Sequence, residues 1–90
     1  MKKTVKYNPT GIDDLPNDKS VLYRIKTRTG NDNYVGVTKR GRVQDRIKDH
    51  LDEIPGSKVQ IEQFGSISDT REKEGRLIKR NRPRYNEQGK

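Results

Sequence analysis

Two short apolar segments joined by a strong turn signal constrain the fold of this chain more than any other feature. Apolar and polar residues alternate along residues 21–27, which is typical of a strand with one buried face that includes Tyr23. Residues 29–33 are rich in glycine, asparagine and aspartate and favour a turn, and residues 34–37 form a second short strand. Because so short a connection joins antiparallel neighbours, these segments predict a β-hairpin.

Two helices and a third strand are expected after the hairpin. Apolar side chains recur every four positions along residues 43–53 and indicate a helix with one buried stripe. Residues 59–64 alternate as a strand. A second helix is expected from Asp69, which with Glu72 resembles a capping box, and Pro83 stops it. We therefore predict an α+β fold, a three-stranded antiparallel sheet flanked by helices.

The ends of the chain are expected to differ in organisation. Residues 1–19 are polar and interrupted by proline and glycine, so we expect an N-terminal arm with one turn near residues 12–15. Residues 20–90 are expected to form a single domain. Gly75 lies inside the second helix, where it costs about 1 kcal/mol relative to alanine. Either it lets that helix approach the sheet closely, or it is an unforced glycine in a marginal helix.

The charge of the chain favours a polyanionic partner. The formal net charge is +8 and the pI is about 9.9, which indicates nucleic acid rather than a merely solvated surface. Only 26% of the residues are hydrophobic, and no segment approaches the ~20 apolar residues of a membrane span. The basic N-terminus is not followed by the apolar stretch of a signal peptide. We expect a cytoplasmic protein with no membrane partner and no small-molecule cofactor.

Cysteine is absent from the chain. Its absence excludes a disulfide scaffold and a cysteine-based zinc site. A reducing compartment is consistent with this composition.

Six residues are candidates for phosphodiester chemistry because of what they supply together. They are Tyr23, Tyr34, Arg46, His50, Glu74 and Asn86. Hydrolysis of a phosphodiester needs a group that orients water and groups that neutralise charge on the phosphoryl and leaving oxygens. A divalent ion supplies both kinds of neutralisation, and Mg²⁺ needs only one or two carboxylates. Glu74 alone is therefore a sufficient metal ligand.

Each of these residues, taken singly, also has an ordinary structural explanation. Arg46 lies beside the buried helical stripe, where a guanidinium can hold a phosphate, and His50 follows one turn later and can donate to a phosphate or relay a proton. A phenol has a pKa of about 10, so Tyr23 and Tyr34 are poor bases unless a cation assists them or they only position water. The tyrosines are equally consistent with core residues, His50 with a surface residue, and Glu74 with a solvated helix face.

Basic residues gather at the ends of both expected helices and are candidates for binding a nucleic-acid backbone. They are Lys39, Arg40, Arg42, Lys79, Arg80, Arg82 and Arg84. The alternative is that they only solvate the surface. The sequence contains no Walker loop, paired-histidine metal motif or Ser/His/Asp arrangement.

Taken in order, these motifs resemble the GIY-YIG endonuclease superfamily, and most closely the N-terminal nuclease module of the excision-repair subunit UvrC. Residues 21–23 (Val-Leu-Tyr) and 34–36 (Tyr-Val-Gly) stand where the two family triplets lie. Residues 46–50 look like the Arg-x-x-x-His helix of the family. Glu74 and residues 77–86 look like the end of the module. The resemblance covers about residues 18–88.

The resemblance implies a nuclease domain over residues 20–90 with one Mg²⁺ or Mn²⁺ ion. By this resemblance Glu74 would hold the ion, and Tyr23 would act as general base or orient the attacking water. Tyr34 would support Tyr23. Arg46 would stabilise the phosphate, and Asn86 would brace the site. His50 matches a position that is often polar in the family.

The chain also departs from the family pattern. Val37 stands where the excision-repair relatives have a lysine, so activation of Tyr23 relies on another cation, for which Lys39 is a candidate. The segment before Arg46 is longer than the family pattern, which leaves open that Arg42 takes the role of Arg46.

We therefore expect a small stand-alone, metal-dependent endonuclease that hydrolyses DNA. One alternative is a non-catalytic basic module that binds nucleic acid. A weaker one is a structural protein that uses the tyrosines as core.

Overall fold

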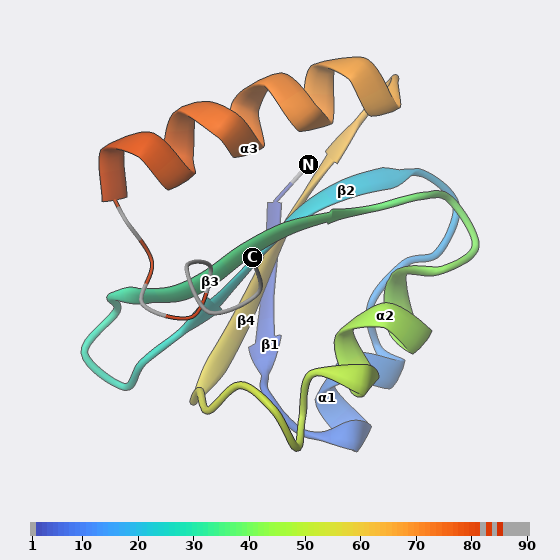
Figure 1. The fold of residues 1–90 in the computed structure, drawn as a ribbon. Coiled ribbons are helices and arrows are strands. Elements are labelled where there is room, and N and C mark those ends of the chain that lie inside the picture. The colour runs from blue at the N-terminus through green and yellow to red at the C-terminus, as the bar shows by residue number, and fades with distance from the viewer. Residues whose placement is uncertain (1, 82, 84, 86–90) are drawn as a thin grey trace.

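The computed structural model describes residues 2–81, 83 and 85 and shows an α+β fold in which an antiparallel sheet lies between helices (Figure 1). Its elements are β1 (Lys2–Lys6), α1 (Pro9–Asp13), β2 (Ser20–Lys26), β3 (Asp32–Thr38), α2 (Val43–Asp49), β4 (Lys58–Phe64) and α3 (Ile67–Asn81). The strand order is β1-β4-β2-β3. No helix in the described part of the chain has the length and apolarity that crossing a membrane requires.

The sheet has four strands, so the prediction of three was wrong. The additional strand is β1, which lies in the segment that we interpreted as a polar arm. It pairs antiparallel with β4, with Lys3 opposite Ile61 and Val5 opposite Val59. Because β1 is an edge strand with mostly exposed side chains, lysines occupy positions at which a central strand would carry apolar residues. Its sequence therefore lacks the alternation by which strands are recognised.

The single turn expected in the N-terminal segment is the short helix α1. Asn8 caps it, since the Asn8 Oδ1 atom accepts a hydrogen bond from the Gly11 N–H at 2.7 Å. Ile12 is the residue that α1 buries. The helix begins before the predicted turn because proline is well tolerated at its first position.

The hairpin predicted from the first two strands is present as β2 and β3. Gly30 lies in the turn with a φ of 94°, a conformation that favours glycine. Across the hairpin, Tyr23 pairs with Gly36 and Ile25 with Tyr34. On its other side β2 pairs with β4, so β2 is a central strand and β3 is an edge strand.

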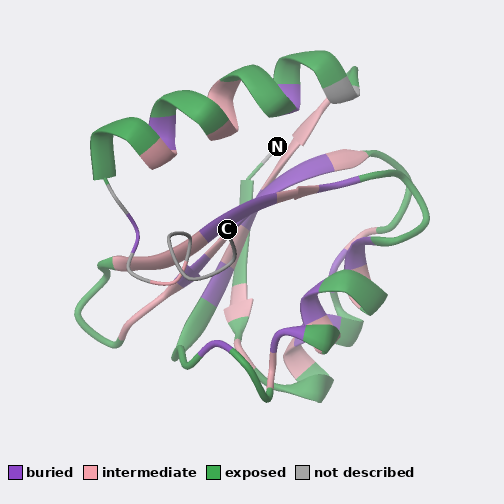
Figure 2. Cartoon of the chain, viewed as in Figure 1, coloured by how far each residue is buried: buried purple, intermediate pink, exposed green. Residues whose placement is uncertain are grey.

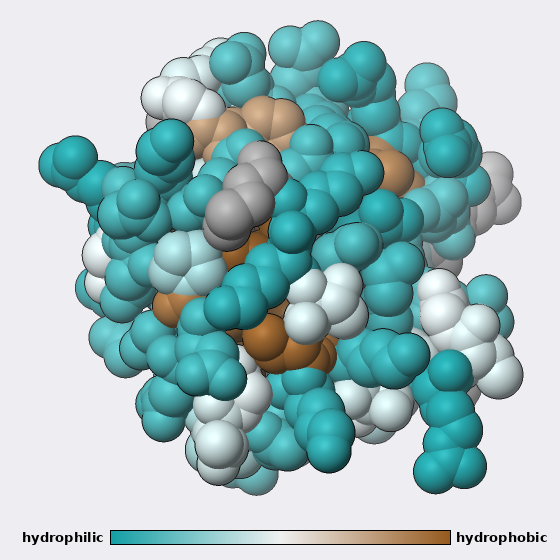
Figure 3. Space-filling model, turned by 180° about the vertical axis from the view of Figure 1, so that it is seen from behind, coloured by the Kyte–Doolittle hydropathy of each residue, from teal (hydrophilic) through white to brown (hydrophobic). Residues whose placement is uncertain are grey.

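Side chains alternate along the strands and divide the core into two layers. Figure 2 shows that buried residues lie mainly along the strands and on parts of α2 and α3. The layer toward α1 and α2, here called the α2 layer, contains Ile12, Leu15, Val21, Tyr23, Ile25, Val43, Ile47, Ile54, Val59 and Ile61. The layer toward α3, here called the α3 layer, contains Leu22, Val35 and Leu77 with the partly buried Val37, Phe64 and Ile78. The faces predicted for β2 and for the stripe of α2 are thus confirmed. Outside these layers the surface is mostly hydrophilic, with a small apolar area on the face shown in Figure 3.

The ends of the two longer helices differ from the predictions. Helix α2 ends at Asp49, and His50 is its C-cap residue rather than a residue inside a longer helix. Helix α3 begins earlier than Asp69 because Ser66 supplies the cap. The Ser66 Oγ atom accepts a hydrogen bond from the Asp69 N–H at 3.2 Å, and the Thr70 hydroxyl donates to the Ser66 carbonyl at 2.8 Å.

Gly75 makes no close approach to the sheet. It is exposed, and a Cβ atom at this position would meet nothing within 4 Å. Of the two interpretations of Gly75, the unforced glycine is therefore the one that the structure supports.

Candidate functional site

A hydrogen bond inside the α2 layer joins Tyr23 to His50. The Tyr23 Oη atom and the His50 Nε2 atom are 2.7 Å apart, and the two residues are 1% and 9% exposed. Strand β2 directs Tyr23 into this layer, and the C-terminal cap of α2 places His50 against it. The sequence left open that His50 is a surface residue or a donor to a phosphate. In the structure it is instead a buried residue bonded to Tyr23.

Tyr34 completes a group of three rings, here called the aromatic trio (Tyr23, Tyr34 and His50). The ring centre of Tyr34 lies 5.9 Å from that of Tyr23 and 4.8 Å from that of His50. Tyr34 is partly buried and packs against the α2 layer. The two tyrosines are diagonal neighbours on one face of the hairpin, because Tyr23 pairs with Gly36 and Tyr34 with Ile25.

Gly36 lies directly beneath the phenol of Tyr23. A Cβ atom at Gly36 would lie 2.6 Å from the Oη atom of Tyr23 and 2.8 Å from a ring carbon of Tyr34. Real side chains do not tolerate such distances, so a larger residue here would displace both rings. The glycine of the second triplet therefore makes room for the aromatic trio.

The surroundings of Tyr23 and His50 leave both groups uncharged at neutral pH. Burial raises the pKa of Tyr23 above its ordinary value, Tyr34 raises it further, and Arg46 acts in the opposite direction. Burial lowers the pKa of His50, and the positive charge of Arg46 lowers it further. The negative charges of Glu53 and Asp49 raise this pKa, but by less. The pair is thus a neutral phenol bonded to a neutral imidazole.

The position of the imidazole proton follows from the other ring nitrogen. Among the described residues, the buried His50 Nδ1 atom has no hydrogen-bond partner. A buried N–H without an acceptor is rarer than a buried lone pair without a donor. We therefore assign the proton to Nε2, which donates to the Tyr23 Oη atom. The hydroxyl proton of Tyr23 then remains free to be donated elsewhere.

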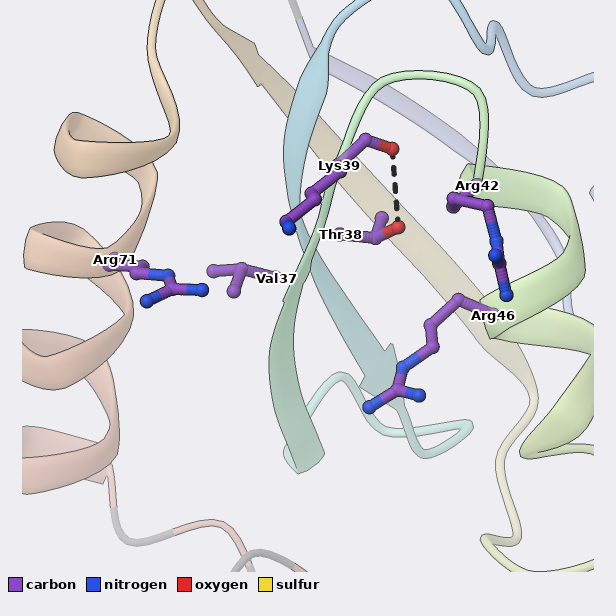
Figure 4. Close-up of a pocket in the computed structure, with 6 residues that line it drawn as sticks. All are labelled: Val37, Thr38, Lys39, Arg42, Arg46 and Arg71. Carbon is purple, nitrogen blue, oxygen red and sulfur yellow. Dashed lines mark hydrogen bonds between the residues drawn. The ribbon is translucent and has the colours of Figure 1, made fainter.

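A pocket of about 260 Å³, here called the basic pocket, is lined in part by Arg46, the residue whose charge acts on Tyr23 and His50. It is lined by Val37, Thr38, Lys39, Arg42, Arg46 and Arg71. Figure 4 shows that Arg42 and Arg46 come from the α2 side of β3 and Arg71 comes from α3. Because every charged side chain in this lining is a cation, the pocket is suited to an anion such as a phosphate.

Arg46 links the basic pocket to the aromatic trio. It lines the pocket and its charge acts on both Tyr23 and His50. Arg42 is exposed at the N-cap position of α2. Lys39, which we considered as the cation that activates Tyr23, also lines the pocket, but Arg46 is the cation whose charge lowers the pKa of Tyr23.

Glu74 is not part of the aromatic trio. It lies on α3, which covers the opposite face of the sheet. Its side chain is half-buried, burial raises its pKa, and Arg71 acts to lower it. Because Arg71 also lines the basic pocket, Glu74 lies within one helical turn of that pocket. The structure thus brings together Tyr23, Tyr34, Arg46 and His50, and places Glu74 on the helix that covers the opposite face of the sheet, outside the lining of the pocket.

A metal ion at this site would have one protein carboxylate. The described residues contain no group of three or more His, Cys, Asp and Glu side chains that could hold an ion. The buried Asp32 carboxylate is already paired with cations, since its Oδ2 atom accepts hydrogen bonds from Arg24 and Asn81 and its Oδ1 atom lies 3.6 Å from the Lys26 Nζ atom. Mg²⁺ is commonly held by one or two carboxylates with water and phosphate oxygens completing its shell. The half-buried Glu74 carboxylate fits that minimum.

The remaining predicted residues lie at the edges of the site or outside the description. Lys39, Arg40 and Arg42 are exposed between β3 and α2, and Lys79 and Arg80 are exposed in the last turn of α3. Asn86, Arg82 and Arg84 lie outside the described residues. Tyr85 donates its N–H to the Asn33 carbonyl at 2.8 Å and packs against the α2 layer, on the face that holds the trio.

Arg71 was not among the predicted site residues. It lies inside an amphipathic helix with several other basic residues, and nothing local distinguishes it from them. Its position three residues before Glu74 was the one available signal. No protein-family model matches the chain, and no curated protein matches it. The functional interpretation therefore depends on the residues and their geometry.

Proposed function

We propose that this chain is a small metal-dependent endonuclease of the GIY-YIG type that hydrolyses DNA phosphodiester bonds. The proposal depends on one observation above all, the buried hydrogen bond between Tyr23 and His50 beside Arg46 at a pocket whose charged lining is entirely basic. A core tyrosine without a function needs only one partner for its hydroxyl. Here a buried phenol is bonded to an imidazole, and the guanidinium whose charge acts on both of them lines a basic pocket.

In this proposal Tyr23 orients the attacking water. Its raised pKa keeps it protonated at neutral pH, so it does not act as a phenolate. The bond from His50 fixes the position of its oxygen. A fixed phenol oxygen can hold a water molecule in line with a phosphate bound in the basic pocket, which lowers the entropic part of the barrier.

Arg46 is the proposed phosphate ligand, with Arg42 and Arg71 as neighbouring cations in the same pocket. A guanidinium can form two parallel hydrogen bonds to phosphate oxygens, which fixes orientation as well as charge. Because the cations come from both α2 and α3, the phosphate would be held from two sides (Figure 4). Charge that develops on the phosphoryl oxygens is then stabilised by groups already in place.

Glu74 is the residue that would hold a Mg²⁺ or Mn²⁺ ion. When bound, such an ion supplies neutralisation of the phosphate and of the leaving oxygen. Glu74 follows Arg71, a lining residue of the pocket, by three positions on α3; burial raises the pKa of its carboxyl group, and the positive charge of Arg71 acts against that effect. Asn86 is still proposed to brace the site, on the basis of the resemblance to the GIY-YIG family alone.

A non-catalytic DNA-binding module is the second candidate, and one observation favours it. Glu74 lies on the opposite face of the sheet from Tyr23, whereas a complete metal site brings its acid close to the water-orienting group. Such a module would use the same basic pocket to hold a phosphate without cutting beside it. It predicts binding that weakens with salt and no nicking.

Nicking of supercoiled plasmid DNA in Mg²⁺ or Mn²⁺ distinguishes the two candidates. We expect nicking by the wild type, none in EDTA, and none by Tyr23→Phe, which keeps the ring and loses the hydroxyl. DNA affinity, measured in EDTA, should be the same for both proteins. Absence of nicking by the wild type in either metal would favour the binding module.

A further inference from the structure

A second hollow adjoins the basic pocket, and Lys39 borders both. Its volume is about 520 Å³, within the range of sites that hold small organic ligands. Lys19, Lys39 and Arg40 line it, and all three are exposed. Asp18 is the one acid in the lining, and its Oδ1 atom accepts a hydrogen bond from the Gln63 amide at 2.9 Å. The hollow is therefore cationic on balance and open to a solute.

Phe64 gives this hollow an aromatic wall. The ring is partly buried and packs against the α3 layer. Lys73 also fixes it, because its Nζ atom lies 5.7 Å from the ring centre and is held at 2.6 Å by Glu62. The ring thus packs against its own domain and also lines the hollow.

We infer that this hollow binds an unpaired nucleotide next to the phosphate held in the basic pocket, an inference that depends on the proposed function. A base can stack on Phe64 while Lys19, Lys39 and Arg40 contact the backbone phosphates. Stacking on an aromatic ring together with a basic groove is how proteins hold single-stranded nucleic acid without reading its sequence. In a regular duplex each base is already paired and stacked, so it cannot occupy the hollow.

The substrate class follows from this arrangement. The protein would select DNA with an unpaired nucleotide beside the cleaved bond, as in a bulge, a single-stranded extension or a branch. Selection would depend on structure and be tolerant of sequence, because every base presents a flat aromatic face.

Binding in EDTA to two matched probes tests this inference without requiring cleavage. One probe is a regular duplex, and the other is the same duplex with one unpaired 2-aminopurine, whose fluorescence changes on stacking. We expect the full chain to bind the second probe more tightly. Phe64→Leu should weaken that binding by about fivefold or more and leave duplex binding unchanged. Phe64→Tyr, which keeps a ring, should bind as the wild type does.

Three further variants keep the test valid if Phe64→Leu is unstable. Ile78→Leu alters the same α3 layer outside the hollow and serves as the packing control. Arg40→Ala removes an exposed cation of the hollow that does not line the basic pocket, and should reduce the preference for the unpaired probe. Arg28→Ala removes an exposed arginine in the hairpin turn and should leave the preference for the unpaired probe unchanged.

Equal binding of both probes by the wild type would overturn the inference, as would equal losses for both probes in Phe64→Leu. If the protein nicks plasmid but does not distinguish the probes, the nucleotide site is wrong and the nuclease proposal stands. If it distinguishes them through Phe64 but never nicks DNA, the nucleotide site stands and the nuclease proposal is wrong.

Discussion

The Nε2 atom of His50 lies 2.7 Å from the Oη atom of Tyr23, between the sheet and the end of α2. This contact joins a strand residue to a helix-cap residue that are 27 positions apart in the sequence. It fixes the phenol oxygen beside Arg46 and leaves the Nδ1 atom of the imidazole without a partner among the described residues.

His50 should make folding sensitive to mild acid. Its pKa is lowered from the usual 6.5, so the unfolded chain takes up a proton there more readily than the folded one. Stability from this residue is complete above about pH 6.5 and is lost as the pH falls toward the lower folded value. Urea unfolding between about pH 5 and about pH 8 should show a steeper loss for the wild type than for His50→Gln. Parallel curves for the two proteins would contradict the assignment, since their other acidic groups are the same.

Replacement of Gly36 by alanine should damage the site, while the same change at Gly75 should not. At Gly36 the added carbon meets Tyr23 and Tyr34 at less than 3 Å, which should lower the free energy of unfolding by about 2–3 kcal/mol. At Gly75 it meets nothing and removes a helix-breaking glycine, which should raise the free energy by about 1 kcal/mol. Urea unfolding measures both. A stable Gly36→Ala protein with normal nicking would show that the rings do not need their present positions.

Arg46→Ala should slow cleavage by about a hundredfold, because one preorganised contact to the phosphoryl oxygens is lost. Arg46→Lys should recover only part of the rate, since an ammonium group cannot form the paired hydrogen bonds of a guanidinium. Arg42→Ala, at the N-cap of the same helix and in the lining of the same pocket, is the matched control. Single-turnover nicking rates of the two alanine variants show which arginine is the phosphate ligand. A larger loss of rate in Arg42→Ala than in Arg46→Ala would assign that role to Arg42.

Glu74→Gln should abolish metal-dependent nicking and leave the fold intact. The substitution keeps the size of the side chain and removes a carboxylate whose pKa is raised by burial. The free energy of unfolding should therefore be unchanged or slightly higher, while DNA binding in EDTA is retained. Nicking assays over a range of Mg²⁺ and Mn²⁺ concentrations check this, and activity above about a twentieth of wild type would exclude Glu74 as the required ligand.

Local periodicity in the sequence was sufficient to predict the hairpin, the two faces of β2 and the buried stripe of α2. These features are encoded within a few consecutive residues, because side-chain direction follows directly from the strand or helix period. The same local information failed for β1, whose edge position permits lysines, and for the start of α3, where Ser66 rather than Asp69 supplies the cap.

The sequence by itself determined which residues are candidates for chemistry on a phosphate, and which strands and helices hold most of them. Only the tertiary structure decided that Tyr23 meets His50, that Arg71 shares a pocket with Arg46, and that Glu74 approaches from the other face of the sheet. Contacts of this kind depend on how distant elements pack, and packing is fixed by the burial of the whole core rather than by the pattern within any one segment.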